Sequence, residues 1–90
     1  DADAATLTLA GEALAGLGEF DQARAVWNRA LFALPASART ARRELLVRLA
    51  RVEDDHGEPA VALRLWQSVL ELEPGLPEAR RRIQDLSGFH

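Results

Sequence analysis

The sequence has 90 residues, 48% of them hydrophobic, a formal net charge of -3 at pH 7 and no cysteine. Such a chain is long enough for one domain with a core, and it lacks the residues for disulfides or thiolate metal sites. Its acidic balance argues against general attraction to nucleic acid. No stretch approaches the roughly 20 apolar residues of a membrane span, so we expect a soluble protein, cytoplasmic or periplasmic. The chain begins at Asp1 and lacks methionine, which predicts a domain of a longer polypeptide or a processed product.

The first two predicted helices form a hairpin around Gly18. Apolar residues at helical spacing mark the first helix: Leu7, Ala10, Gly11, Leu14 and Leu17. Gly18 stops this helix because glycine tolerates a left-handed backbone. Asp21 is the predicted N-cap of the second helix, which buries Trp27 and ends before Pro35.

Three further helices follow. Ser37 is the predicted N-cap of a third, which runs towards Gly57. Pro59 opens a fourth that ends before Pro74, and Pro77 opens a short fifth helix with a narrow apolar side. No segment alternates apolar and polar residues long enough to indicate a strand. The sequence therefore predicts an all-α protein.

The two hairpins share a repeated motif. Trp27 returns as Trp66, 39 positions later, and the glycine, alanine and proline around each tryptophan keep the same spacing. Within each copy the alanine and the tryptophan are four residues apart, on one face of a helix. A glycine turn, an Ala-x3-Trp helix and a closing proline resemble the tetratricopeptide repeat, a motif of about 34 residues. The first halves match less well: Leu7 and Leu46 stand where the family favours Trp, and Glu53 where it favours Tyr.

The resemblance implies a fragment of a right-handed α-solenoid, forming a single domain over residues 1–90. Repeat one would span about 4–37, repeat two about 38–76 and a capping helix about 77–87. By the same resemblance, the first helix of each pair and the capping helix line a concave groove for a peptide or helix of another protein. The groove would be lined by Thr8, Glu12, Glu44, Val47, Arg48, Arg51, Asp54, Arg81 and Arg82.

The resemblance suggests a scaffold or adaptor that binds a partner protein, with the groove arginines contacting acidic side chains. The Lys and Asn that some family members use to hold a chain-terminal carboxylate are missing from this groove. In the alternative interpretation, the arginines belong to a solvated face and pair with acidic residues of the same chain: Glu44, Asp54, Asp55, Glu78 and Asp85.

Two other functions stay open. The first helix carries leucines on more than one side, which favours a structural spacer or self-association into a homo-oligomer, or further repeats upstream. Binding to RNA is a minor alternative that would use arginines of the third helix: Arg39, Arg42, Arg43, Arg48 and Arg51. Trp27 and Trp66 are expected in the core and not as a platform for bases.

Catalysis and metal binding find little support in the sequence. Ser37, Ser68 and Ser87 lie in no nucleophile motif, and no glycine-rich loop follows a strand. The acidic segment 54–58 has no spacing typical of a zinc or calcium site. We therefore expect no enzyme activity, no catalytic residue, no metal and no cofactor.

Overall fold

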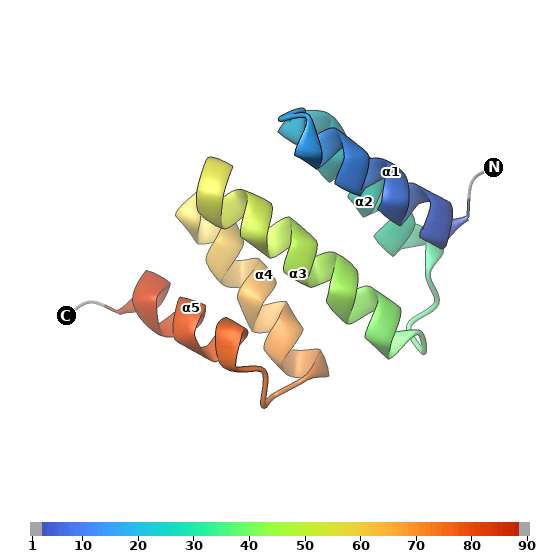
Figure 1. Ribbon diagram of the computed structural model, residues 1–90. Coiled ribbons are helices and arrows are strands. Elements are labelled where there is room, and N and C mark those ends of the chain that lie inside the picture. The colour runs from blue at the N-terminus through green and yellow to red at the C-terminus, as the bar shows by residue number, and fades with distance from the viewer. Residues whose placement is uncertain (1–2, 89–90) are drawn as a thin grey trace. The chain divides into compact units, whose positions relative to one another are not determined.

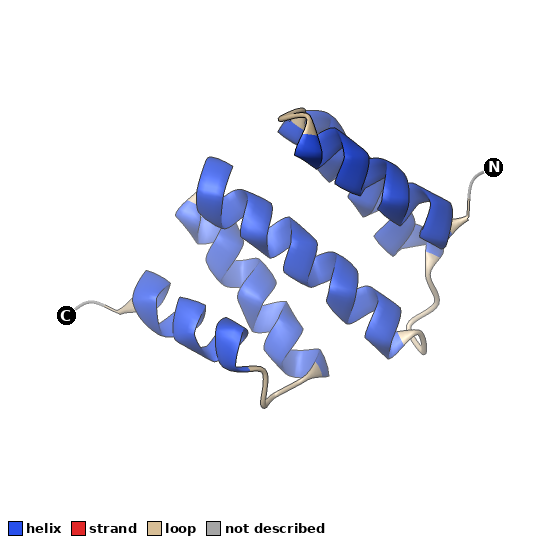
Figure 2. Cartoon of the chain, viewed as in Figure 1, coloured by secondary structure: helices blue, strands red, loops and turns tan. Residues whose placement is uncertain are grey.

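The computed structural model describes residues 3–88, so Asp1, Ala2, Phe89 and His90 lie outside the described residues. Within the described residues five helices follow one another: α1 (Ala4–Gly16), α2 (Phe20–Ala33), α3 (Arg39–His56), α4 (Pro59–Leu72) and α5 (Pro77–Ser87) (Figure 1). All regular structure in residues 3–88 is helical, which confirms the predicted all-α class (Figure 2). Helix α1 packs against α2, and α4 packs against α5, as hairpin-like pairs. The chain divides into two units, residues 1–45 and 46–90, and each is described by itself.

The helix ends of the first unit follow local backbone chemistry. The Asp3 carboxylate caps α1 by accepting a hydrogen bond from the Thr6 amide at 2.8 Å. Gly18 has a φ of 82°, so the predicted glycine stop is confirmed. The predicted cap at Asp21 is wrong: α2 begins at Phe20 after Glu19, and Asp21 lies in its first turn. There the carboxylate pairs with Arg24 and favours the helix N-terminus by its charge.

The start of α3 also differs from the prediction. The predicted N-cap, Ser37, lies two residues before Arg39, the first residue of the helix. Its carbonyl accepts a hydrogen bond from the Arg39 amide at 2.9 Å, so Ser37 belongs to the turn after Pro35. Residues from Pro35 to Ala38 close this turn through a second bond, from the Ala38 amide to the Pro35 carbonyl. A tight turn thus occupies the place where the sequence predicts a cap.

Close contact between Gly11 and Trp27 joins α1 to α2. Trp27 is buried, and its indole Nε1 donates to the Thr8 carbonyl at 3.1 Å. A Cβ atom at Gly11 would lie only 2.2 Å from that nitrogen. The lack of a side chain at Gly11 therefore allows the indole to reach the backbone of α1.

In the second unit, prolines define the helix starts as predicted. Pro59 opens α4 and Pro77 opens α5, where their missing amide hydrogens are not needed. Trp66 is fully buried at the position equivalent to Trp27. Glu53 is buried, and its Oε1 accepts a hydrogen bond from the Glu58 amide at 3.3 Å. Its carboxylate thus links the end of α3 to the residue preceding α4.

Within residues 3–88, no helix combines the length and the apolar character needed to cross a membrane.

Candidate functional site: a charged face on α3 and α5

The second unit has a polar surface pocket between the C-terminal half of α3 and helix α5. Its volume is about 400 Å³. The lining residues are Arg51, Asp54, Asp55, Trp66, Glu78 and Arg82. Five of these six side chains are ionisable, so the pocket is built to hold charge.

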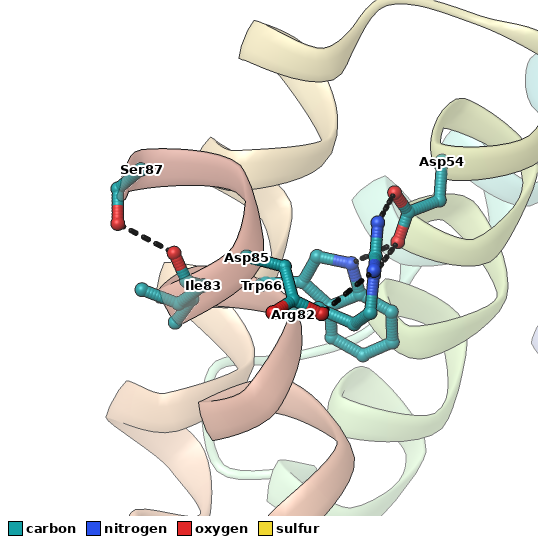
Figure 3. A network of polar contacts seen from close by, with 6 residues as sticks. All are labelled: Asp54, Trp66, Arg82, Ile83, Asp85 and Ser87. Atoms are coloured by element: carbon teal, nitrogen blue, oxygen red, sulfur yellow. Dashed lines mark hydrogen bonds and ion pairs between the residues drawn. The ribbon is translucent and has the colours of Figure 1, made fainter. Parts of the chain in front are cut away.

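Asp54 is the most enclosed charged group of this pocket, with 9% of its side chain exposed. Arg82 donates two hydrogen bonds to it, from Nε to Oδ2 at 2.8 Å and from Nη2 to Oδ1 at 2.6 Å. The indole Nε1 of Trp66 also donates to Oδ2, at 2.9 Å. Figure 3 shows the indole and the guanidinium converging on this one carboxylate from α4 and α5. Asp54 therefore connects all three helices of the second unit.

The same contacts explain why the pKa of Asp54 is lowered. The hydrogen bonds from Arg82 hold the pKa of Asp54 below its usual 3.8, while burial opposes them and the Trp66 bond assists them. The carboxylate in turn raises the pKa of Arg82. Asp85 adds a further contact to Arg82, with Oδ2 3.1 Å from Nη1. Each shift favours the charged form, so the Asp54–Arg82 pair stays ionised at neutral pH.

Arg51 and Glu78 form a second fork beside the first. The distances are 2.9 Å from Nε to Oε2 and 2.7 Å from Nη2 to Oε1. This pair lies nearer to solvent, because 57% of the Arg51 side chain and 40% of the Glu78 side chain are exposed. The hydrogen bonds from Arg51 lower the pKa of Glu78. Exposed pairs of this kind contribute only about 0.2–1 kcal/mol to stability, so this fork can open at low cost.

Three predicted groove residues therefore meet in one pocket: Arg51, Asp54 and Arg82. Their guanidinium and carboxylate groups bind one another or Glu78, as the solvated-face interpretation expects for these residues. Arg81 on α5 is exposed, and Arg48 on α3 is partly exposed.

The other predicted groove residues have different surroundings. Val47 is buried with the core side chains, and the exposed Glu44 has Oε2 3.7 Å from Arg43 Nη2. Thr8 and Glu12 belong to the first unit, where the Thr8 hydroxyl donates to the Ala4 carbonyl at 2.7 Å. The exposed Glu12 lies on the same helix.

Sequence reasoning missed the polar role of Trp66, which was expected only to fill the core. One signal was present in the repeat: Asp54 occupies the position where the first copy has Ala15, as 54 and 15 differ by the same 39 residues as the two tryptophans. A carboxylate in place of an alanine, near a buried indole and an arginine-rich helix, indicates a hydrogen-bonded pair. Within residues 3–88, no group of three or more His, Asp or Glu side chains is placed to hold a metal ion.

Comparison of the chain with protein-family models, with curated proteins and with solved structures gives no match.

Proposed function

We propose that this chain is a protein-interaction module of the tetratricopeptide kind, and that the charged face of α3 and α5 binds an acidic segment of a partner protein. The observation that carries the proposal is the exposed fork between Arg51 and Glu78. There a guanidinium on α3 already holds a carboxylate in the two-bond geometry by which proteins recognise acidic side chains. A partner carboxylate can replace Glu78 without breaking the core.

The neighbouring groups favour a protein ligand over a nucleic acid. The pocket lining contains two arginines and three carboxylates, from Asp54, Asp55 and Glu78. Carboxylates would repel the regularly spaced phosphates of RNA, whereas a peptide can place its carboxylates opposite the arginines and neutral or basic groups opposite Asp54 and Asp55. Arg48 and Arg81 lie on the two helices that frame the pocket and can extend the contact.

Substitutions in a capture experiment test this proposal. The wild-type protein would be used to identify a bound partner by mass spectrometry, and the bound segment would then be titrated against variants. We expect Arg48→Ala and Arg51→Ala each to weaken binding by about tenfold, the usual effect of losing one hydrogen-bonded charge. Arg64→Ala, an exposed change on α4, is the matched control and should leave binding intact.

A variant with the opposite expected effect sharpens the test. Glu78→Gln removes the carboxylate that competes for Arg51, so affinity for an acidic segment should rise by about two- to fivefold, corresponding to the small free energy of an exposed pair. If Arg64→Ala abolishes binding while the α3 arginines can be removed without loss of affinity, the proposal for the charged face of α3 and α5 is wrong.

Self-association is a second candidate, favoured by a separate observation. Leu9 on α1 and Leu17 just after it are large apolar side chains that are mostly exposed. Exposed apolar side chains of this size favour burial against another molecule. Sedimentation velocity of the wild-type protein and of Leu9→Arg would show whether α1 joins copies of the chain.

A further inference from the structure

A second surface lies in the first unit, at the C-terminal end of α2. The Phe32 side chain is 93% exposed. Together with Asn28, Leu31 and Arg42 it lines a shallow depression of about 460 Å³, and these four residues are called the Phe32 patch. Aromatic residues, including Phe, and arginine are enriched at protein–protein interfaces.

The internal repeat indicates that Phe32 does not serve the fold. The equivalent residue of the second copy is Glu71, because 71 and 32 differ by the same 39 residues as the two tryptophans. Both positions are exposed on the second helix of their pair, so the helix register is compatible with a charged residue there. In contrast, the preceding Leu31 and its equivalent Leu70 are the same residue type and are both partly buried. Core packing therefore does not explain the aromatic side chain of Phe32.

The chain around the Phe32 patch is basic, although the protein is acidic overall. Residues 22–43 contain no Asp or Glu, and their arginines are Arg24, Arg29, Arg39, Arg42 and Arg43. Arg24 pairs with Asp21, and Arg43 lies 3.7 Å from Glu44. The exposed Arg29 precedes Phe32 by three residues and so lies close to it on the helix surface.

Arg42 lines the same depression as Phe32. A cation in the first turns of a helix opposes the helix dipole, so its place near the start of α3 is unfavourable for that helix alone. Its Nη1 donates to the Leu31 carbonyl at 3.5 Å, near the end of α2, where the dipole is negative and no basic residue lies in the last turn. This contact is long for a hydrogen bond, and together with the shared depression it leaves the positive charge near the exposed ring.

We propose that the Phe32 patch binds an acidic amphipathic segment of a partner protein. An apolar side chain of that segment packs on Phe32, and its carboxylates face Arg42 and Arg29. Two copies of the chain meeting patch to patch would bring these like charges together, which disfavours self-pairing. The surface is distinct from the charged face of α3 and α5, so it adds a second binding region to the module.

A synthetic peptide provides the probe: a labelled amphipathic helix of about 16 residues with leucine on one face and glutamate on the other. Fluorescence anisotropy would measure how tightly the peptide binds. Amide chemical shifts of the isotope-labelled protein, measured by nuclear magnetic resonance, would show where it binds. We expect shifts at the Phe32 patch, weaker binding at higher salt, and a loss of affinity of at least tenfold for Phe32→Ala. Arg42→Gln should lose severalfold in affinity, whereas Arg64→Ala, an exposed change on α4, should bind as the wild type does.

Several results would overturn the proposal. One is that Phe32→Ala binds the peptide as tightly as the wild type does. Another is that a peptide with glutamine in place of glutamate binds equally well. A third is that the chemical-shift changes are confined to α3 and α5. Tighter binding of a labelled single-stranded RNA at the same residues would assign the patch to nucleic acid, and dimerisation abolished by Phe32→Ala would assign it to a second copy. Phe32→Glu, which installs the residue of the second repeat, is a further variant should Phe32→Ala not fold. In Arg51→Ala the chemical-shift changes at the Phe32 patch should persist even where changes on α3 and α5 are lost, which separates this test from that of the charged face.

Discussion

Adding a single methyl group at Gly11 tests how the first hairpin is packed. In a Gly11→Ala variant the new Cβ would lie 2.2, 2.4 and 2.6 Å from the Nε1, Cδ1 and Cε2 atoms of Trp27. Non-bonded carbon atoms prefer separations of about 3.5–4.0 Å, so the indole must move by more than 1 Å. Trp27 is buried, and its hydrogen bond to the Thr8 carbonyl would lengthen or break.

Opposing effects decide how far Gly11→Ala lowers the free energy of unfolding. Overpacking of this kind costs about 1–3 kcal/mol, and a buried donor left without its acceptor costs about 1–3 kcal/mol more. In the opposite direction, alanine stabilises a helix interior by about 0.8–1 kcal/mol relative to glycine. Because the indole can relax in part, we expect the free energy of unfolding to fall by about 1–3 kcal/mol in Gly11→Ala. Gly16→Ala in the same helix is the control, since a Cβ there meets nothing within 4 Å, and it should be neutral or stabilising.

Urea denaturation followed by circular dichroism measures this loss. Nuclear magnetic resonance of the two indole N–H groups shows its cause, because the Trp27 signal should move while Trp66 serves as an internal reference. Gly11→Ala with undiminished stability and an unmoved Trp27 signal would refute the reasoning.

The second repeat suggests a rescue. There Ala50 stands at the position of Gly11, and the indole of Trp66 donates to Asp54 instead of a backbone carbonyl. The residue of the first repeat equivalent to Asp54 is Ala15. We therefore expect the double variant Gly11→Ala with Ala15→Asp to recover part of the lost stability, by supplying a carboxylate for the displaced indole. A double variant no more stable than Gly11→Ala would show that the two indole arrangements are not interchangeable.

The remaining predictions concern the second unit and the core. Because the folded-state pKa values of Asp54 and Glu78 lie below their usual 3.8 and 4.5, their contribution to stability is complete above about pH 5 and is lost as the pH falls through the lowered values. Acid titration of unfolding should therefore be shallower in Asp54→Asn. Asp54→Ala leaves the Trp66 indole without its acceptor and should cost about 1–3 kcal/mol in urea denaturation. Trp27→Ala and Trp66→Ala should each cost about 3–5 kcal/mol, and neutral effects would contradict the core assignment.

The Asp54 cluster shows where sequence reasoning stops. Asp54 binds Trp66, which is 12 residues away, and Arg82, which is 28 residues away. Charge and periodicity place these residues on three helices, but several carboxylates were available to each arginine. Which pair forms depends on how α4 and α5 pack against α3. Only the tertiary structure therefore identifies the two ion pairs, Asp54–Arg82 and Arg51–Glu78, and shows that the second is the more exposed.

Helix number and most helix limits, by contrast, follow from the sequence alone. Gly18, Pro59 and Pro77 restrict the backbone wherever they occur, because their conformational preferences are covalent and do not depend on distant contacts. The predicted caps failed at Asp21 and Ser37, because a side-chain cap competes with other local hydrogen bonds of similar strength. The sequence by itself thus determined the helical class and the repeat. Tertiary packing decided the burial of Val47, the approach of Trp27 to Gly11, and the pairing of Arg51 with Glu78, since each depends on contacts between helices.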